Sequence, residues 1–205
     1  MQRFFDLWAR VYDARAPQKL TYGPVHDSVC AALAQRRAPR DVLDVGCGTG
    51  ILATRLSAVY PGTAVTGVDL SPGMLAQARR RSGTVTWVEA DAAALPFADD
   101  AFDALCCTES FHWYPDQIAA LVEFRRVLRN DGTLYLAFVN PATATVEAAV
   151  NALTRAAGRP ARWATASHLR GLLDAAGFRV RERVKVRRWP PGVMMPTYLT
   201  VAEPN

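Results

Sequence analysis

Short apolar runs alternate with segments of helical period along most of the chain. The predicted strands are Val42–Val45, Ala64–Asp69, Val85–Glu89, Phe102–Cys107, Leu134–Val139, Phe178–Val186 and Tyr198–Ala202. The predicted helices run from about Pro24 to Leu33 and over Ile51–Val59, Ser71–Arg81, Ile118–Leu128, Thr145–Ala157 and Ser167–Ala176. Strands that alternate with helices make right-handed crossovers, which predicts a doubly wound α/β fold with a mainly parallel sheet of seven strands. No helix separates the last two strands, so we expect an antiparallel hairpin at one edge of this sheet.

A chain of 205 residues suits a single domain. We expect it to consist of an amino-terminal helical segment (1–39), a central core (40–140) and a final part with helices and the hairpin (141–205). In the first segment Phe4, Phe5 and Trp8 recur at helical spacing. They form either an amphipathic lid over a pocket or an ordinary buried stripe.

Composition limits the cellular compartment and the chemistry. Half of the residues are apolar and 21% are charged, which is ordinary for a globular protein. No apolar stretch approaches the roughly 18 residues that span a bilayer, and Asp6 and Arg10 interrupt the start of the chain, where a secretory signal would be apolar. We therefore expect a cytoplasmic protein without an integral membrane segment. The spacing of the cysteines and histidines does not match a structural zinc site, so we expect no metal.

The net charge of +5 comes from one segment near the end of the chain. Residues Arg179–Arg188 contain six basic side chains and one acid, Glu182, which accounts for the whole excess. This pattern lacks the broad basic face of a nucleic-acid binder, so we expect no nucleic-acid partner. The basic residues alternate at strand period and would share one face of a strand. They either protect a sheet edge or contact an anionic substrate or membrane surface.

The strongest chemical signal is a glycine-rich turn that follows the first predicted strand of the core. Gly46, Gly48 and Gly50 separate the strand from the helix, and glycine lets a ligand approach the backbone closely. In an open parallel sheet such a turn lies at the carboxyl ends of the strands, where ligands bind. Asp69 ends the next strand, where it could accept hydrogen bonds from a ribose diol, and Asp91 follows the third. These features indicate a nucleoside cofactor.

The spacing of the glycines distinguishes between nucleoside cofactors. A dinucleotide fingerprint reads GxGxxG, whereas this turn reads GxGxG and continues with Ile51. Asp44 lies just ahead of the first glycine. It would disfavour a pyrophosphate and suit a ligand that carries an ammonium group.

A resemblance to a known family rests on four segments: VLDVGCGTG (42–50), GVDLSPGML (67–75), ADAAALPFADDAFDAL (90–105) and RRVLRNDGTLYL (125–136). They resemble the successive motifs of class I S-adenosylmethionine-dependent methyltransferases, which have a Rossmann-like sheet. FDLWARVYD (5–13) is similar to the amino-terminal segment of the small-molecule branch that includes ubiquinone/menaquinone biosynthesis methyltransferases. The resemblance implies S-adenosyl-L-methionine as cofactor and S-adenosyl-L-homocysteine as product.

The same resemblance implies roles for individual residues. The turn around Cys47, with Gly46, Gly48 and Gly50, would wrap the methionine part of the cofactor, next to Asp44. Asp69 would bind the ribose hydroxyls, Leu70 and Met74 would lie beside adenine, and Asp91 with the Ala92 amide would lie at the adenine edge. Thr108 would meet the amino-acid portion, and Tyr12 would fold over it.

The acceptor is less well defined by the residues. Thr108–Phe111 stands where an Asn-Pro-Pro-Tyr motif would indicate methylation of nucleobase or glutamine amino groups, so those acceptors are not expected. A small, hydrophobic or lipid-like metabolite fits a chain without an added substrate domain. His112 and Glu109 are the candidate general bases, or His112 only positions the cofactor and Glu109 is a surface acid. Phe111, Trp113 and Tyr114, with Trp163 from a later segment, would line an acceptor pocket or belong to the core.

A small-molecule methyltransferase that acts by in-line displacement is the preferred function. A nicotinamide-dependent oxidoreductase and a non-catalytic S-adenosylmethionine-binding domain stay open as alternatives. The sequence makes no prediction about oligomeric state.

Overall fold

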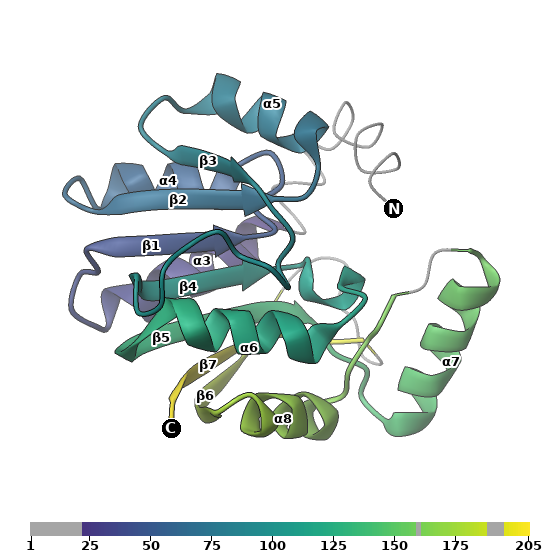
Figure 1. Cartoon of the computed structure of the whole chain (residues 1–205). Coiled ribbons are helices and arrows are strands. Elements are labelled where there is room, and N and C mark those ends of the chain that lie inside the picture. Colours follow the sequence, from purple (N-terminus) through teal and green to yellow (C-terminus); the bar gives the residue numbers. More distant parts are fainter. Residues whose placement is uncertain (1–21, 159–160, 188–194) are drawn as a thin grey trace.

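The computed structural model of the protein describes residues 22–158, 161–187 and 195–205. The strands are β1 (Asp41–Val45), β2 (Ala64–Asp69), β3 (Thr86–Glu89), β4 (Phe102–Thr108), β5 (Leu128–Val139), β6 (Phe178–Val186) and β7 (Thr197–Pro204). They form one seven-stranded sheet in the order β3-β2-β1-β4-β5-β7-β6 (Figure 1). The first five strands are parallel, whereas β7 is antiparallel to both β5 and β6. The predicted fold class and the antiparallel edge are confirmed.

The described helices are α3 (Gly23–Ala34), α4 (Ile51–Val59), α5 (Pro72–Arg81), α6 (Gln117–Val127), α7 (Ala144–Ala156) and α8 (Ala166–Ala175), with a short 3₁₀ turn, η2 (Phe111–Trp113). Four of them, α5 to α8, begin after a Ser, Asp or Thr whose side chain caps the first turn, and α4 begins after Gly50. The Ser71 hydroxyl accepts a hydrogen bond from the Met74 amide, and the Asp116 carboxylate accepts one from the Ala119 amide. Such caps satisfy amide groups that the first helical turn leaves free.

Each face of the sheet is covered by helices (Figure 1). On one face α6 and α8 bury Leu121, Phe124 and Leu173 against Leu136 and Phe138 of β5. On the other face α3 and α4 are buried in a second cluster together with residues of β1, β4 and β7. Burial on both faces explains why the central strands are almost continuously apolar.

The first half of β5 differs from the prediction. The strand was expected to begin at Leu134 after a turn at 130–132, but it begins at Leu128. Its pairing with β4 jumps from Phe102–Leu128 to Ala104–Thr133, so the residues between form an irregularity within the strand. The Asn130–Gly132 segment, exposed at Asn130 and Asp131, is therefore a bulge inside an existing strand rather than the turn that leads into it.

A second bulge changes the edge strand β6. The alternation of basic residues predicted one basic face, and this prediction is wrong. The register shifts between Val180 and Glu182, so Arg179 pairs with Glu203 while Arg183 pairs with Thr200. Glu203 and Thr200 lie on opposite faces of β7, because the side chains of successive residues in a strand point to alternate faces. Arg183 consequently lies on the same face of the sheet as α8.

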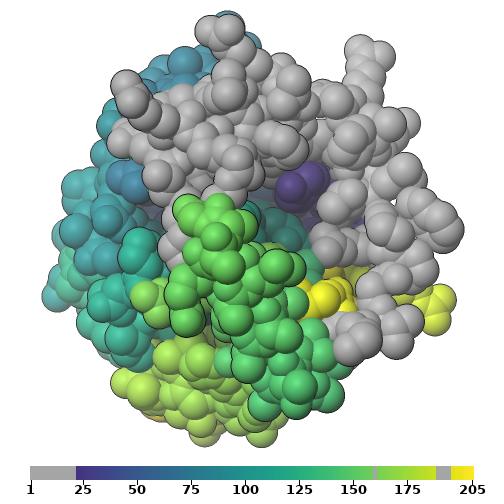
Figure 2. Space-filling view, turned by 90° about the vertical axis from the view of Figure 1, so that its right-hand side faces the viewer, coloured from purple at the N-terminus to yellow at the C-terminus, as the bar shows by residue number. Residues whose placement is uncertain are grey.

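Helix α7 contains no buried residue and stands away from the sheet (Figure 1). Glu147 connects it to the start of α8, because its carboxylate accepts a hydrogen bond from the Thr165 amide at 2.7 Å. Figure 2 views this side of the molecule, where α7 projects toward the reader. Among the described residues, no helix is long and apolar enough to cross a bilayer.

Several expectations concern residues outside the described ranges. They are the amino-terminal lid with Phe4, Phe5 and Trp8, the contact of Tyr12 with the cofactor, and the charge of Arg188.

Candidate functional site

The glycine-rich turn lies at the carboxyl end of β1, where the neighbouring strand β2 holds it. The amides of Gly46 and Cys47 both donate to the Val68 carbonyl oxygen, at 2.8 and 2.9 Å. Gly46, Gly48 and Gly50 have φ angles of 70°, 56° and 77°, in the left-handed region that favours glycine. The backbone of the turn therefore requires all three predicted glycines.

Of the three glycines in this turn, only Gly48 has no described atom near the position of a Cβ. A Cβ on Gly46 would lie 2.4 Å from the Ser110 hydroxyl, and a Cβ on Gly50 would lie 2.3 Å from the Trp87 ring. A Cβ on Gly48 would meet no described atom within 4 Å. Gly46 and Gly50 thus fit the turn against Ser110, which follows β4, and Trp87 of β3, while no described atom covers Gly48.

Asp44 provides a buried negative charge directly beneath the turn. Its side chain lies within the sheet with a residue exposure of 1%, and neither carboxylate oxygen has a hydrogen-bond partner among the described residues. Burial, and then the charge of Asp69, raises the pKa of Asp44 to about 7, although the Ala53 amide acts in the opposite direction. A cationic ligand group would supply the missing partner.

Asp69 joins the turn to the second predicted motif. One carboxylate oxygen accepts a hydrogen bond from the Gly48 amide at 2.8 Å, and the other accepts one from the Ser71 amide at 2.9 Å. The predicted partners of adenine differ in exposure, since Leu70 is half exposed whereas Met74 is buried in α5. Asp44 and Asp69 are brought together with Gly48, as the sequence predicted.

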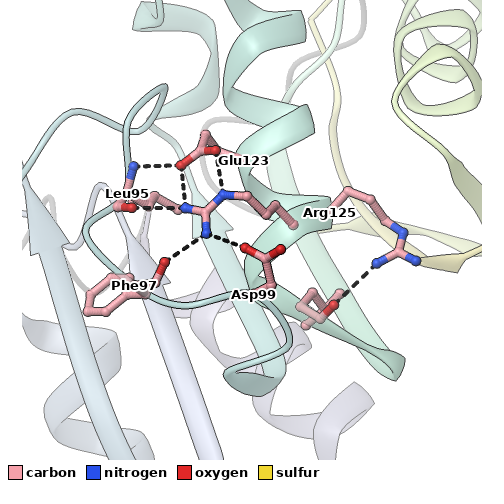
Figure 3. Close-up of polar contacts among 7 residues, drawn as sticks. Leu95, Phe97, Asp99, Glu123 and Arg125 are labelled. Carbon is pink, nitrogen blue, oxygen red and sulfur yellow. Dashed lines mark hydrogen bonds and ion pairs between the residues drawn. The ribbon is translucent and has the colours of Figure 1, made fainter.

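Asp91 follows β3 on an exposed bend, where its carboxylate accepts a hydrogen bond from the Ala93 amide at 2.9 Å. The segment after it is fixed by Arg126 of α6, which donates to the carbonyl oxygens of Leu95 and Phe97. Arg126 also pairs with Glu123 and Asp99 (Figure 3). This network anchors the segment that follows Asp91 and Ala92. No pattern in the sequence predicted this network.

The end of β4 contains a polar cluster that the sequence did not predict. The Ser110 hydroxyl lies 3.1 Å from the Tyr114 hydroxyl, 3.2 Å from the Cys107 sulfur and 3.3 Å from the Val45 carbonyl oxygen. Burial raises the pKa of Tyr114 well above its usual value and that of Cys107 to about 12, so both groups stay protonated. The cluster connects the end of β4 to the end of β1. The one hint of this cluster in the sequence is the small side chain of Ser110, which lies close against Gly46.

Glu109, a candidate base, adopts a φ of 51°, which is unusual for a residue with a side chain. Its amide donates to the Ala137 carbonyl oxygen of β5 at 2.7 Å, immediately after Thr108 ends β4. The chain therefore turns sharply here, next to the glycine-rich turn. Such strained positions cluster at functional sites.

His112, the other candidate base, is buried among aromatic rings. Its ring stacks on Trp163 with centroids 3.9 Å apart and an angle of 12°, and the Trp113 ring lies 4.8 Å away. The Arg162 amide donates to the His112 carbonyl oxygen at 2.6 Å, which holds the later segment in place. Phe111 is completely buried against Phe138. The structure thus brings His112 and Trp163 together, and it places Phe111 in the core.

A cavity of about 680 Å³ lies at the other end of the sheet, where the parallel strands begin. It is lined by Arg36, Arg40, Asp103 and Arg129, which flank the amino ends of β1, β4 and β5. Because ligands of open parallel sheets bind at the carboxyl ends of the strands, this cavity is separate from the candidate site.

The site has the layout of a nucleoside-binding α/β protein, and comparisons with known proteins specify the family. Residues 43–136 match the family model described as "Methyltransferase domain". "Malonyl-[acyl-carrier protein] O-methyltransferase" of Geobacter sulfurreducens is 39% identical over 150 residues, which cover 69% of this chain and 56% of that protein. "Demethylmenaquinone methyltransferase" of Thermus thermophilus is 45% identical over 106 residues, which cover 50% of this chain and 48% of that protein. The chain spans about half the length of the curated relatives it matches.

Solved structures agree with the fold. A Haloferax volcanii methyltransferase in complex with the Trm112 activator has a TM-score of 0.78 at 23% identity, covering 98% of this chain and 97% of that one. The [4+2]-cyclase SpnF has a TM-score of 0.72 at 24% identity, covering 87% and 81%. At these identities the structures show the fold alone.

The chain belongs to the class I S-adenosylmethionine-dependent methyltransferases. S-adenosylmethionine is the cofactor of this class and of this chain. The predicted family and cofactor are confirmed.

Proposed function

We propose that this protein transfers the methyl group of S-adenosylmethionine to a small, apolar acceptor. The observation that carries the proposal is the buried Asp44 carboxylate beneath the open face of Gly48, since this pair offers an anion and an accessible backbone to one ligand. The bound cofactor supplies a methyl group that its sulfonium centre has already activated. The protein then has to bind and align the two reactants, which can contribute up to roughly 7–11 kcal/mol to lowering the barrier.

In this proposal each acidic residue contacts a different part of the cofactor. Asp44 neutralises the ammonium group, and Asp69 accepts hydrogen bonds from the ribose hydroxyls with Leu70 beside the adenine ring. Asp91 and the Ala92 amide bind the adenine edge. Thr108 lies near the amino-acid portion. The anchoring of the 95–99 segment by Arg126 supports the adenine assignment, because it fixes the backbone next to Asp91.

The acceptor would bind beside the rings of His112, Trp113 and Trp163. Stacked aromatic side chains favour an apolar or lipid-like molecule, and their faces also attract a sulfonium cation. His112 or Glu109 would remove a proton when the acceptor must lose one. The relative named as a demethylmenaquinone methyltransferase supports an apolar acceptor, whereas the malonyl-[acyl-carrier protein] methyltransferase is named for an acyl group on a carrier protein.

Calorimetric titration with S-adenosylhomocysteine tests the cofactor site. Asp69→Ala removes two backbone partners and the ribose acceptor, and Gly48→Val fills the open face, so both should abolish measurable binding. Asp131→Ala is the matched control, because it removes an exposed carboxylate far from the turn, and it should bind like the wild type. Unchanged binding by the Asp69 and Gly48 variants would refute the proposed site.

Binding alone does not establish methyl transfer, because a protein of this fold is named as a cyclase. Incubation with cofactor labelled in the methyl group and a metabolite extract separates the two functions. A labelled acceptor supports the enzyme, whereas tight binding without transfer to any extract supports the non-catalytic alternative.

A further inference from the structure

Arg183 is a half-buried, positively charged residue of the edge strand β6. The bulge before it directs its side chain to the α8 face of the sheet, opposite Thr200. The guanidinium carbon lies 3.5 Å from the centroid of the Tyr198 ring. One terminal nitrogen donates to the Asn140 side-chain oxygen at 3.3 Å, which is a long hydrogen bond to a neutral acceptor.

No carboxylate pairs with this guanidinium among the described residues. The Arg183 Nε atom is buried without a hydrogen-bond partner, and so is the hydroxyl of Thr200 across the strand pair. Burial lowers the pKa of Arg183 and the like charge of Arg170 acts in the same direction, while Tyr198 opposes them. By contrast, Arg181 on the same strand pairs with Glu203 at 2.5 Å. Among the described residues, the guanidinium of Arg183 therefore has no anionic partner for its N–H groups.

An unsatisfied buried donor is costly, and in folded proteins it calls for a specific explanation. A planar guanidinium with free donors matches the two oxygens of a carboxylate or phosphate. The Tyr198 ring, whose centroid lies 3.5 Å from the guanidinium carbon, restricts the guanidinium before any ligand arrives, which would reduce the entropy lost on binding.

The position of Arg183 connects it to the proposed acceptor site. Asn140 is the first residue after β5, at the carboxyl end of that strand, and its side-chain Nδ2 donates to the Ala164 carbonyl oxygen at 2.9 Å. The neighbouring residue Trp163 stacks on His112. The same short segment therefore touches Arg183's partner on one side and the candidate base on the other.

We propose that Arg183 binds an anionic group, a carboxylate or phosphate, that the methyl acceptor carries. This inference rests on the proposed function, since it assigns the acceptor to the space beside His112. The acceptor would then be amphipathic, with an apolar part among the aromatic rings and a charged end at Arg183. Protection of the sheet edge is the competing role, and it requires positive charge but no ligand.

A matched set of probes tests the assignment on the protein saturated with S-adenosylhomocysteine at low salt. The set is 3-phenylpropionate, its neutral amide 3-phenylpropionamide and the phosphate monoester of 3-phenylpropanol, with inorganic phosphate as the free anion. Binding is measured by calorimetry for the wild type, Arg183→Gln, Arg183→Lys and Arg179→Gln. Arg179→Gln is the control, because this substitution removes the same charge from an exposed position on the same strand.

We expect the wild type and Arg179→Gln to bind the carboxylate at least about tenfold tighter than the amide, as charge-assisted hydrogen bonds provide. Arg183→Gln should lose this preference, and Arg183→Lys should retain part of it. A stronger response to the phosphate ester or to inorganic phosphate identifies phosphate as the anion. Absence of a carboxylate or phosphate preference in the wild type, including no binding of any probe, overturns the assignment, as does a preference that survives in Arg183→Gln. The affinity for S-adenosylhomocysteine is measured in parallel. A wild type that does not bind S-adenosylhomocysteine would contradict the proposed function instead.

Discussion

The raised pKa of Asp44 should make cofactor affinity depend on pH near neutrality. The buried carboxylate has a pKa of about 7 in the free protein, so it is mostly protonated at pH 6. A bound ammonium group requires the ionised form, and binding must therefore release the proton. The perturbation is a decrease in pH from 7.5 to 6.0, compared between the wild type and Asp44→Asn, which cannot titrate.

The expected magnitude follows from the ionised fraction of Asp44. With a pKa of about 7, roughly one molecule in eleven is ionised at pH 6 and about three in four at pH 7.5. Apparent affinity scales with the competent fraction, which gives about an eightfold weaker Kd at pH 6. The α-amino group of the ligand has a pKa of about 7.7–8.0 and is partly neutral at pH 7.5, so the observed factor should be about five to six.

Calorimetry in two buffers with different ionisation enthalpies measures both affinity and proton release. The wild type should bind S-adenosylhomocysteine more weakly at pH 6.0 and release close to one proton there. Asp44→Asn should bind weakly at both pH values without proton release from this site. A wild-type affinity that is equal at the two pH values, or an equal pH dependence in Asp44→Asn, would refute the reasoning.

Three further predictions concern the stability of the free protein. Because the folded-state pKa of Asp44 is raised from 3.8 to about 7, the native state binds more protons than the unfolded state between these values. Its free energy of unfolding should fall as pH rises through that window, by up to roughly 4 kcal/mol, and urea unfolding of Asp44→Asn should lack this decline. Gly46→Ala places a Cβ against Ser110 at a positive φ and should destabilise by about 2–4 kcal/mol; equal unfolding midpoints would exclude that contact. Arg126→Met frees two carbonyl oxygens and should cost about 2 kcal/mol with a several-fold weaker cofactor Kd, whereas an unchanged Kd would show that the 95–99 segment does not support binding.

Much of the central fold follows from local pattern. Helix α4 begins and ends at the predicted residues, Ile51 and Val59, because a glycine precedes it and Pro61 follows. The glycine-rich turn was predictable for a related reason. Its φ angles are a local requirement that only glycine meets easily, and Asp69 is located by the end of the next strand.

The features that sequence analysis missed depend on partners distant in the chain. The bulge in β6 is a mismatch of register with β7, so alternation within β6 alone wrongly predicted that Arg179 and Arg183 share one face. The cluster around Ser110 requires β1 and β4 to be adjacent, which brings Val45 and Tyr114 to the same hydroxyl. Neither the register nor this adjacency is encoded by the periodicity of one segment.

The measurement that tests the central claim most directly is a crystal structure of the protein with S-adenosylhomocysteine. The account predicts the ligand in the turn between Val45 and Ile51, with its ammonium group at Asp44 and its ribose at Asp69. Density for the ligand elsewhere, or preferential binding of a nicotinamide dinucleotide in that turn when both compounds are offered, would contradict it.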